Sequence, residues 1–352
     1  MIRKKTFWLV VIILTIWNIV LTYMFYDKSK TIQEGTENIT VIENEVNGFS
    51  TDLTHLYDDV ISSIVTVRSD TANGTGVIIR QVDNTVYVAT SYHIIEGAET
   101  VDIALDNYQE IEAAIVGFDA IRDVAILSFE SVFRVDPIDF GASALLESGE
   151  FVVAIGSPLS VDYRGSLSFG LVSSARRTLE LTVSDQDYFI TMIQTDVTLN
   201  SGNSGGPLIN MAGELVGLNT LSMTVDDASG LSFALSSAEV RHIADEIIET
   251  GEVTKCDLGI RAVELSSMTN YQKAALNIDL DVVSGLLVRD VKADFLANSI
   301  GLRTGDIILE INDETIDDIY DLIDAEYTIE DHVDIEILRG SEAMTLSLEI
   351  GS

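Results

Sequence analysis

Short runs of β-branched and aromatic residues recur along much of the chain, separated by Gly, Asn, Asp and Ser. The runs are IVTVRS, GVIIR, VYVAT, VDIAL, AAIVGF, VAILSF, FVVAIG, GLVSSA, ITMIQTD, ELVGLNT and LSFALS. Their spacing is fairly even, and the residues between them are those that favour turns. This pattern predicts an all-β sandwich or a pair of β-barrels.

Segments whose apolar residues have the spacing of a helix flank these runs on both sides. In TDLTHLYDDVISSI, apolar residues from Leu53 to Ile64 recur at the spacing of one helix face. SSAEVRHIADEIIETGEV, after the last β run, also predicts a helix. The remainder, from LGIRAVEL to MTLSLEI, mixes strand-like runs with the helix-like DIYDLIDAEY, which indicates a separate α+β unit.

A long apolar run, residues 7–26, lies near the N-terminus and follows three basic residues at positions 3–5. It is long enough to cross a bilayer, and aromatic residues stand near both ends. A cleaved signal peptide would have a shorter apolar core and a small-residue cleavage site, which TYMFYDKSK does not offer. We therefore expect a cytoplasmic stub and single-pass anchor at 1–28, with the rest of the chain extracytoplasmic. Residues 29–50 indicate a linker; the alternative is a short helical assembly segment.

Composition narrows the classes of function. The net charge is −37, and residues 258–352 alone hold 20 acidic and 6 basic residues. Nucleic-acid binding needs a basic face, so this class is excluded. Acidic residues occur without the spacing of a calcium loop, so no metal or other cofactor is predicted. The single cysteine, Cys256, cannot form an intramolecular disulfide.

The stretch LNSGNSGGPL places Ser204 among Gly202, Asn203, Gly205 and Gly206. One interpretation is a hairpin turn, since all these residues are common in turns. The other is a nucleophile loop whose backbone N–H groups stabilise an oxyanion. The second interpretation requires a base and an acid elsewhere in the chain.

His93 and Asp123 are the candidates for that base and acid. His93 follows the β run VYVAT, and Asp123 directly precedes the apolar run VAILSF. A lone His or Asp at such a position is more often structural, but an acid at the start of a buried strand needs a partner. The order His93, Asp123, Ser204 is that of the chymotrypsin fold.

The motifs GTG, TSYHIIEGA, RDVAIL, AIGSPL, QTDVTLNSGNSGGPL and GLNTLS occur in this order. Together they resemble the HtrA (Deg) family of serine proteases, from about residue 55 to the C-terminus. The resemblance implies a mainly β fold, with a chymotrypsin-like double β-barrel protease domain (51–245) followed by an α+β PDZ domain (255–352). It implies Ser204 as nucleophile, His93 as general base and Asp123 as the acid that orients it. A homotrimer and a role in protein quality control and stress response are also implied.

Further site residues follow from the same resemblance. The amides of Gly202 and Ser204, with Asn203 between them, would form the oxyanion hole. Positions 198–199, 218–220 and 231–234 would line the S1 pocket; the residues taken as substrate-binding are Thr198, Leu199, Leu218, Asn219 and Thr220. No acid stands at 198 or 199, so small or medium aliphatic P1 residues are expected. The chain departs from the family at Tyr92, Ile94 and Ser201.

In the C-terminal unit, Leu258, Gly259 and Ile260 match the carboxylate-binding loop of a PDZ domain. Such a loop binds the C-terminal carboxylate of a peptide, which then adds as a strand. Asp257 stands where an aromatic residue is usual, and its charge is expected to weaken this site; the alternative is an interdomain packing module. Arg176 and Arg177 fall in the segment that matches the family's regulatory loop, and Arg176, Arg177 or both are expected to bridge to acidic PDZ residues.

Two classes of function follow. The first is a membrane-anchored serine endopeptidase that cleaves unfolded or regulatory extracytoplasmic proteins and is regulated by its PDZ domain. The second is a catalytically silent binding or sensor protein built on a protease fold. The complete set Ser204, His93 and Asp123 favours the endopeptidase.

Overall fold

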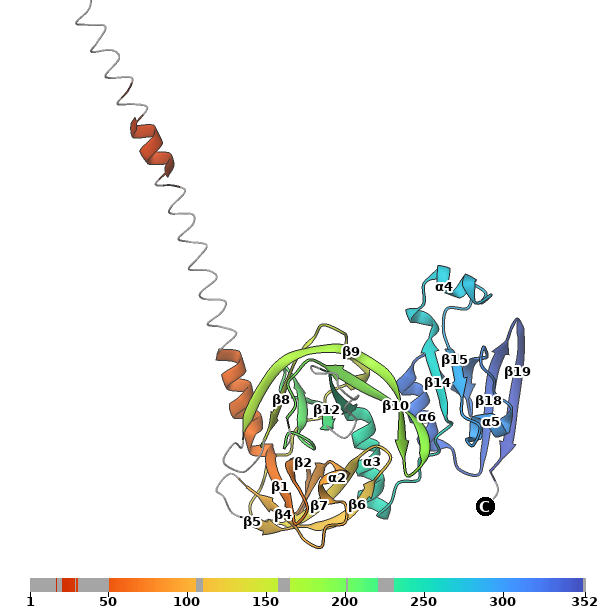
Figure 1. Cartoon of the computed structure of the whole chain (residues 1–352), viewed down its shortest axis with the longest axis horizontal. Coiled ribbons are helices and arrows are strands. Elements are labelled where there is room, and N and C mark those ends of the chain that lie inside the picture. Colours follow the sequence, from red (N-terminus) through yellow and green to blue (C-terminus); the bar gives the residue numbers. More distant parts are fainter. Residues whose placement is uncertain are drawn as a thin grey trace, which may run out of the picture. The chain divides into compact units, whose positions relative to one another are not determined.

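The computed structural model describes residues 17, 21–28, 30, 51–105, 110–157, 165–200, 202–220 and 231–350 (Figure 1). The chain divides into two units, residues 1–56 and 57–352. Most of the predicted anchor and linker lies outside the described residues, although residues 21–28 are helical. Within the described ranges, no helix is long and apolar enough to span a bilayer.

The N-terminal sheet of the second unit has seven antiparallel strands in the order β5-β4-β1-β2-β3-β7-β6. The strands are β1 (Ile64–Ser69), β2 (Asn73–Val82), β3 (Thr85–Thr90), β4 (Val101–Ala104), β5 (Glu110–Glu112), β6 (Ala114–Asp119) and β7 (Val124–Glu130). Val88 of β3 and Leu127 of β7 lie in its apolar core. Thr90 pairs with Ala125, so the chain leaving β3 and the chain entering β7 meet at one end of the sheet.

The second sheet closes into a six-stranded barrel in the order β10-β13-β12-β11-β8-β9. Its strands are β8 (Phe151–Gly156), β9 (Ser166–Val183), β10 (Gln186–Thr195), β11 (Pro207–Asn210), β12 (Leu215–Thr220) and β13 (Ser232–Ser236). Buried apolar residues that alternate along these strands, such as Val152 and Ala154, fill its interior. All the β runs predicted from the pattern are strands, so the expectation of a mainly β, chymotrypsin-like fold is confirmed.

One expectation about local structure is wrong. The segment RRTLELTVSDQDYF, expected to be a loop, forms the outer parts of β9 and β10. Its apolar and polar residues alternate, as in a strand. Ser184 and Asp185 both adopt positive φ, which suits a two-residue hairpin turn. Arg176 and Arg177 therefore lie within a strand.

The helices predicted on either side of the β runs are present. Residues 51–60 are helical, and α3 (Ser237–Thr250) follows β13 directly. The side chain of Ser236 caps α3 by accepting from the Glu239 amide, and Gly251 ends it in the left-handed conformation. The helix packs against β6, β7 and β12, so it joins the N-terminal sheet to the barrel.

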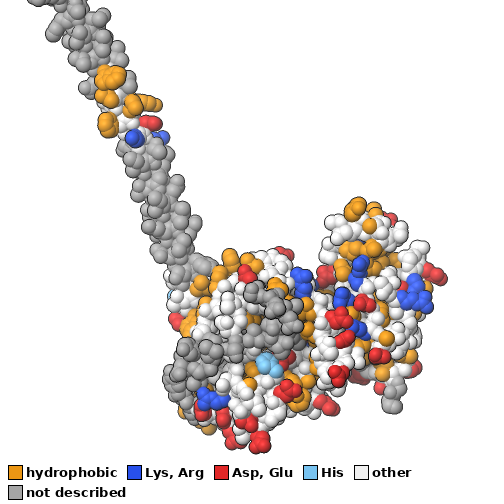
Figure 2. Space-filling model, viewed as in Figure 1, with side chains coloured by type: hydrophobic (Ala, Val, Ile, Leu, Met, Phe, Trp, Pro, Cys, Tyr) orange, Lys and Arg blue, Asp and Glu red, His pale blue; other side chains and the backbone are white. Residues whose placement is uncertain are grey.

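The C-terminal unit is an antiparallel sheet in the order β14-β15-β16-β18-β19, with β17 paired to β16. Its elements are β14 (Ile260–Glu264), α4 (Asn270–Ala275), β15 (Leu286–Val291), α5 (Leu296–Ile300), β16 (Ile307–Ile311), β17 (Glu314–Thr315), α6 (Ile319–Thr328), β18 (His332–Arg339) and β19 (Glu342–Glu349). Ile308, Ile323 and Ile335 belong to one buried core. On the face drawn in Figure 2, acidic side chains are dispersed among polar and apolar ones.

Candidate active site

His93 and Asp123 are brought together by the pairing of β3 with β7. His93 lies in the one-turn helix α2 (Tyr92–Ile95), which follows β3. Its Nδ1 lies 2.8 Å from Asp123 Oδ2 and 3.0 Å from Oδ1. The backbone amide of His93 also donates to Asp123 Oδ1 at 2.8 Å. These contacts fix the plane of the imidazole ring. They do not involve Nε2, which lies on the side of the ring away from Asp123.

Asp123 receives a further hydrogen bond from the hydroxyl of Thr220 at the end of β12. Burial on its own raises the pKa of Asp123, but the hydrogen bonds from His93 and Thr220 outweigh it, so the pKa lies below its ordinary value. Asp123 also adopts a positive φ of 57°, a conformation that costs free energy in a residue other than glycine. The carboxylate is therefore ionised at neutral pH and held in one orientation.

The loop that carries Ser204 is clamped to the N-terminal sheet by Thr75 of the GTG motif. The Thr75 amide donates to the Ser204 carbonyl at 2.9 Å, and the Thr75 hydroxyl donates to the Gly202 carbonyl at 2.6 Å. Gly205 adopts a φ of +75°, and a Cβ there would lie 2.4 Å from the Thr75 carbonyl oxygen. The glycines around Ser204 therefore allow the two sheets to approach each other closely.

The amides of Gly202 and Ser204 are the candidates for an oxyanion hole. Gly202 adopts a φ of +99°, and the Asn203 amide donates to the Asn200 carbonyl at 2.9 Å. No described residue accepts a hydrogen bond from the amide of Gly202 or of Ser204. These two N–H groups therefore remain available as hydrogen-bond donors, as an oxyanion hole requires.

Ser204 and His93 do not form a hydrogen bond with each other among the contacts of the described residues. Ser204 is 3% exposed, whereas a third of the His93 side chain is exposed. Such contacts are commonly long before substrate binds and tighten in the complex. A cavity of about 370 Å³ adjoins His93 and Asp123 and is walled on its far side by residues 181–184 of β9 and its turn.

The residues expected to line the S1 pocket divide into two groups. Thr198 is exposed, and Leu199 is half-buried against the core of the barrel. Leu218 and Asn219 are buried, and the Asn219 side chain donates to the Pro207 carbonyl at 2.7 Å. The Thr220 hydroxyl donates a hydrogen bond to Asp123. The departure at Ser201 lies outside the described residues.

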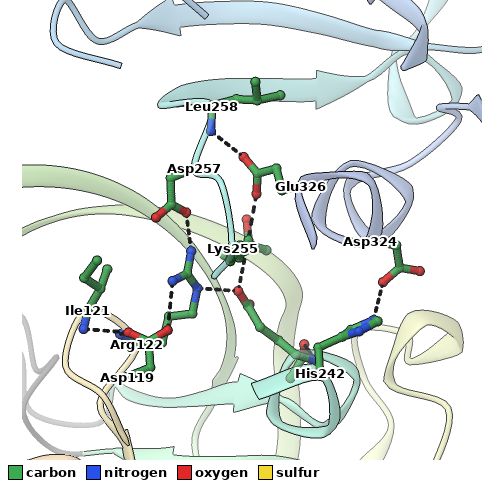
Figure 3. A network of polar contacts seen from close by, with 12 residues as sticks. Asp119, Ile121, Arg122, His242, Lys255, Asp257, Leu258, Asp324 and Glu326 are labelled. Carbon is green, nitrogen blue, oxygen red and sulfur yellow. Dashed lines mark hydrogen bonds and ion pairs between the residues drawn. The ribbon is translucent and has the colours of Figure 1, made fainter. Parts of the chain in front are cut away.

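Two residues of the site were not predicted from the sequence. Thr75 is flanked by Gly74 and Gly76, and this pair of glycines was the signal that another chain segment approaches closely. Arg122 precedes Asp123 and is 4% exposed. Its guanidinium contacts the carboxylates of Asp119, Glu239 and Asp257 (Figure 3). A buried arginine requires such partners. Asp119 lies three residues before Arg122, but nothing local in the sequence indicates Glu239 or Asp257.

The residues expected at the PDZ peptide site are close together. Leu258 and Ile260 are buried, and Gly259 between them adopts a φ of +70°. Asp257 was expected to weaken carboxylate binding through its charge, but that charge is paired with Arg122 (Figure 3).

Of the two arginines expected to contact the PDZ domain, only Arg176 pairs with described residues. Arg176 Nε lies 3.4 Å from Glu264 Oε1, and its guanidinium stands over the Tyr320 ring. Arg177 is exposed and forms no ion pair with any described residue.

Comparison with known proteins agrees with this geometry. A model of the trypsin-like peptidase domain matches residues 74–218, and a model of the PDZ domain matches residues 256–350. The serine protease Do-like HtrA of Bacillus subtilis (strain 168) is 32% identical over 287 residues, which are 80% of this chain and 64% of the relative. The corresponding protein of Lactococcus lactis subsp. cremoris (strain MG1363) is 33% identical, over 79% of this chain and 70% of the relative.

A solved structure, the HtrA-type protease AlgW with tripeptide, has a TM-score of 0.63 and 25% identity over 85% of this chain and 96% of the AlgW chain. The fold and the two family matches together define the class of protein, a trypsin-like peptidase domain joined to one PDZ domain. The chain belongs to the HtrA family of serine proteases. It spans less than two thirds of the length of the Bacillus subtilis relative.

Proposed function

We propose that this protein is a membrane-anchored endopeptidase that cleaves unfolded or regulatory proteins outside the cytoplasm. The observation that carries the proposal is the contact of His93 Nδ1 with Asp123 at 2.8 Å, beside a Ser204 loop whose Gly202 and Ser204 amides are open to an oxygen. The apolar run at 7–26, preceded by basic residues, supports a single-pass anchor in the cell membrane with a cytoplasmic N-terminus.

In this mechanism Ser204 Oγ attacks the scissile carbonyl carbon while His93 Nε2 takes the hydroxyl proton. The negative charge that develops on the carbonyl oxygen is bound by the amides of Gly202 and Ser204. The His93 imidazolium, stabilised by Asp123, gives its proton to the departing amine, and an ester to Ser204 remains. Water then attacks this ester with His93 again acting as base, which releases the acid and restores the hydroxyl.

The expected substrates have small or medium aliphatic P1 residues, because neither Thr198 nor Leu199 supplies an acid for Lys or Arg. Mapping the cleavage sites in denatured casein tests this specificity. We expect Val, Ala or Leu at P1 in most products. Cleavage mainly after Lys or Arg would contradict the proposed pocket.

The PDZ domain is proposed to bind the C-terminal carboxylate of a peptide at Leu258, Gly259 and Ile260, and to regulate the protease. The AlgW protein with a tripeptide shows a peptide in complex with a relative. Contact of Arg176 with Glu264 and with the Tyr320 ring supports a role for this strand in regulation, whereas Arg177 is proposed to contribute less. Family resemblance supports a homotrimer.

Labelling with a fluorophosphonate probe separates the endopeptidase from the silent sensor. A phosphonyl bond to the serine forms only where the nucleophile is activated. We expect the full-length parent to be labelled at Ser204 and the variants Ser204→Ala and His93→Ala to remain unlabelled. A folded parent without label would support the silent sensor.

A further inference from the structure

A carboxylate of the chain itself already lies at the loop assigned to peptide carboxylates. The Leu258 amide donates to Glu326 Oε1 at 2.9 Å. The second oxygen, Glu326 Oε2, lies 3.2 Å from Lys255 Nζ (Figure 3). Glu326 is on α6 and is 8% exposed. Both oxygens are therefore bound within the protein, in the way that a loop amide and a cation bind a ligand carboxylate.

The space beside this carboxylate is also nearly filled. At the Glu326 end of the space between β14 and α6 there remains a cavity of about 30 Å³, which has room for a few water molecules at most. Ile260 of β14 and Leu322 of α6 line it, and Phe189 and Ile190 of β10 close its other side. Further along β14, a cavity of about 380 Å³ is lined by Ala262, Val263, Glu264 and Ile319. It is therefore the end of the groove beside Glu326 that has to open before a peptide carboxylate enters.

We propose that Glu326 is an internal ligand of the carboxylate-binding loop, and that a peptide with a free C-terminal carboxylate binds by displacing it. The inference rests on the proposed function of the PDZ domain as a peptide receptor. The Lys255 side chain is 4% exposed, and its charge neutralises whichever carboxylate occupies the loop. Burial raises the pKa of the Glu326 carboxyl group, so keeping Glu326 ionised in the loop carries a desolvation cost.

Displacement of Glu326 would also change the contacts of residues next to the active site. Lys255 Nζ donates to Glu239 Oε1 at 2.7 Å, and Arg122 Nε donates to the same oxygen at 2.7 Å. Arg122 immediately precedes Asp123, the residue proposed to orient His93. Figure 3 shows these side chains as one connected group between α3 and α6. A ligand that takes the place of Glu326 acts on this group through Lys255.

Peptide binding tests the proposal in the full-length chain with Ser204→Ala, which prevents cleavage of the probe. The probe is a fluorescein-labelled mixture of degenerate peptides of about ten residues with free C-termini, and the control mixture carries C-terminal amides. We expect Glu326→Ala to bind the free-acid mixture at least about tenfold more tightly than the Ser204→Ala parent. Glu326→Gln keeps the shape and an acceptor but loses the charge, so an intermediate gain is expected.

Asp324→Ala is the matched control, because Asp324 lies on the same helix and contacts His242 at 2.9 Å without touching the loop. It should bind as the parent does. Any of three results would overturn the proposal. Asp324→Ala could gain the same affinity, the amide mixture could gain the same affinity, or neither Glu326 variant could gain affinity for the free-acid mixture. If Glu326→Ala does not fold, the affinity of Glu326→Gln for the free-acid mixture tests the proposal. Fluorophosphonate labelling of the Glu326 variants with Ser204 restored reports on the protease separately, so failure of this inference and failure of the peptidase are distinguishable.

Discussion

Among single residues, Asp123 shows how the site is built from contacts that lie far apart in the sequence. It binds His93 through both the ring and the backbone amide, and it accepts from the Thr220 hydroxyl. The two sheets thus meet at one carboxylate. Because its pKa is lowered, Asp123 stays ionised through neutral pH and orients His93 without taking the proton itself.

Asp123→Asn should leave the fold intact and lower kcat by about 10⁴, because the amide favours the wrong His93 tautomer. Thr220→Val removes one hydrogen bond and keeps the charge, so its rate should lie between those of the parent and Asp123→Asn. Initial rates of casein cleavage, with circular dichroism to check folding, measure both. The assignment of Asp123 is wrong if Asp123→Asn cleaves casein at the parent rate.

At the scale of elements, the loop 202–206 depends on its approach to β2. Gly205 has a positive φ, and a Cβ there would lie 2.4 Å from the Thr75 carbonyl oxygen and 2.6 Å from the Ser91 amide nitrogen. Backbone atoms cannot move aside as a flexible side chain does. The loop is therefore held in place by strand β2 rather than by its own turn contacts alone.

Gly205→Ala should destabilise the protein and abolish labelling of Ser204. Gly149→Ala is the control, since Gly149 also has a positive φ of 99° but a Cβ there would meet nothing within 4 Å. The control should lose about 1–2 kcal/mol for the backbone conformation, and Gly205→Ala about 1–3 kcal/mol more for the clash. Urea unfolding measures both free energies. Equal losses would mean that the approach to Thr75 has no energetic role.

At the scale of the whole molecule, a buried ionic group joins the protease and PDZ domains. Arg122 and Lys255 supply its positive charges, and Glu239, on the first turn of α3, contacts both. Burial alone raises the pKa of Glu239, but Lys255 and Arg122 lower it further than burial raises it. Its stabilisation is therefore complete above the unfolded pKa of about 4.3 and is lost as pH falls through the lower folded value.

Glu239→Gln should lower the free energy of unfolding by about 3–5 kcal/mol at neutral pH, because two buried cations lose their shared partner. The difference from the parent should shrink as pH falls below about 4. Urea unfolding across this pH range is the measurement. Glu249→Gln, an exposed change on the same helix, should match the parent; a constant Glu239→Gln difference at all pH values would contradict the assignment.

Regulation through β9 gives a second test at this scale. Arg176→Ala removes contacts with Glu264 and the Tyr320 ring, whereas Arg177→Ala removes an exposed side chain that forms no ion pair with a described residue. We expect peptidase activity to change in Arg176→Ala at low salt and to approach the parent value at high salt, because salt screens such pairs. Activity equal to the parent at every ionic strength would exclude Arg176 from the PDZ signal.

The sequence by itself determined the family of the protein and most of the strands, and it indicated the candidate residues for the chemistry. Alternation of apolar residues and the positions of turn residues are local features, so the β runs, α3 and α6 follow from neighbours along the chain. The order His93, Asp123, Ser204 and the small residues around the serine can also be read directly from the sequence. The expectation of a loop at 176–189 was wrong, because a two-residue turn at Ser184 and Asp185 extends a hairpin there.

Only the tertiary structure decided the partners of these residues. The Arg122 contact with Asp257 spans 135 positions, and the Thr75 contact with Gly202 spans 127. No local period encodes such pairs, because they depend on how the sheets and helices pack. Asp257 illustrates the physical reason: its charge was expected to oppose a ligand carboxylate, but packing places Arg122 beside it and Glu326 in the loop instead.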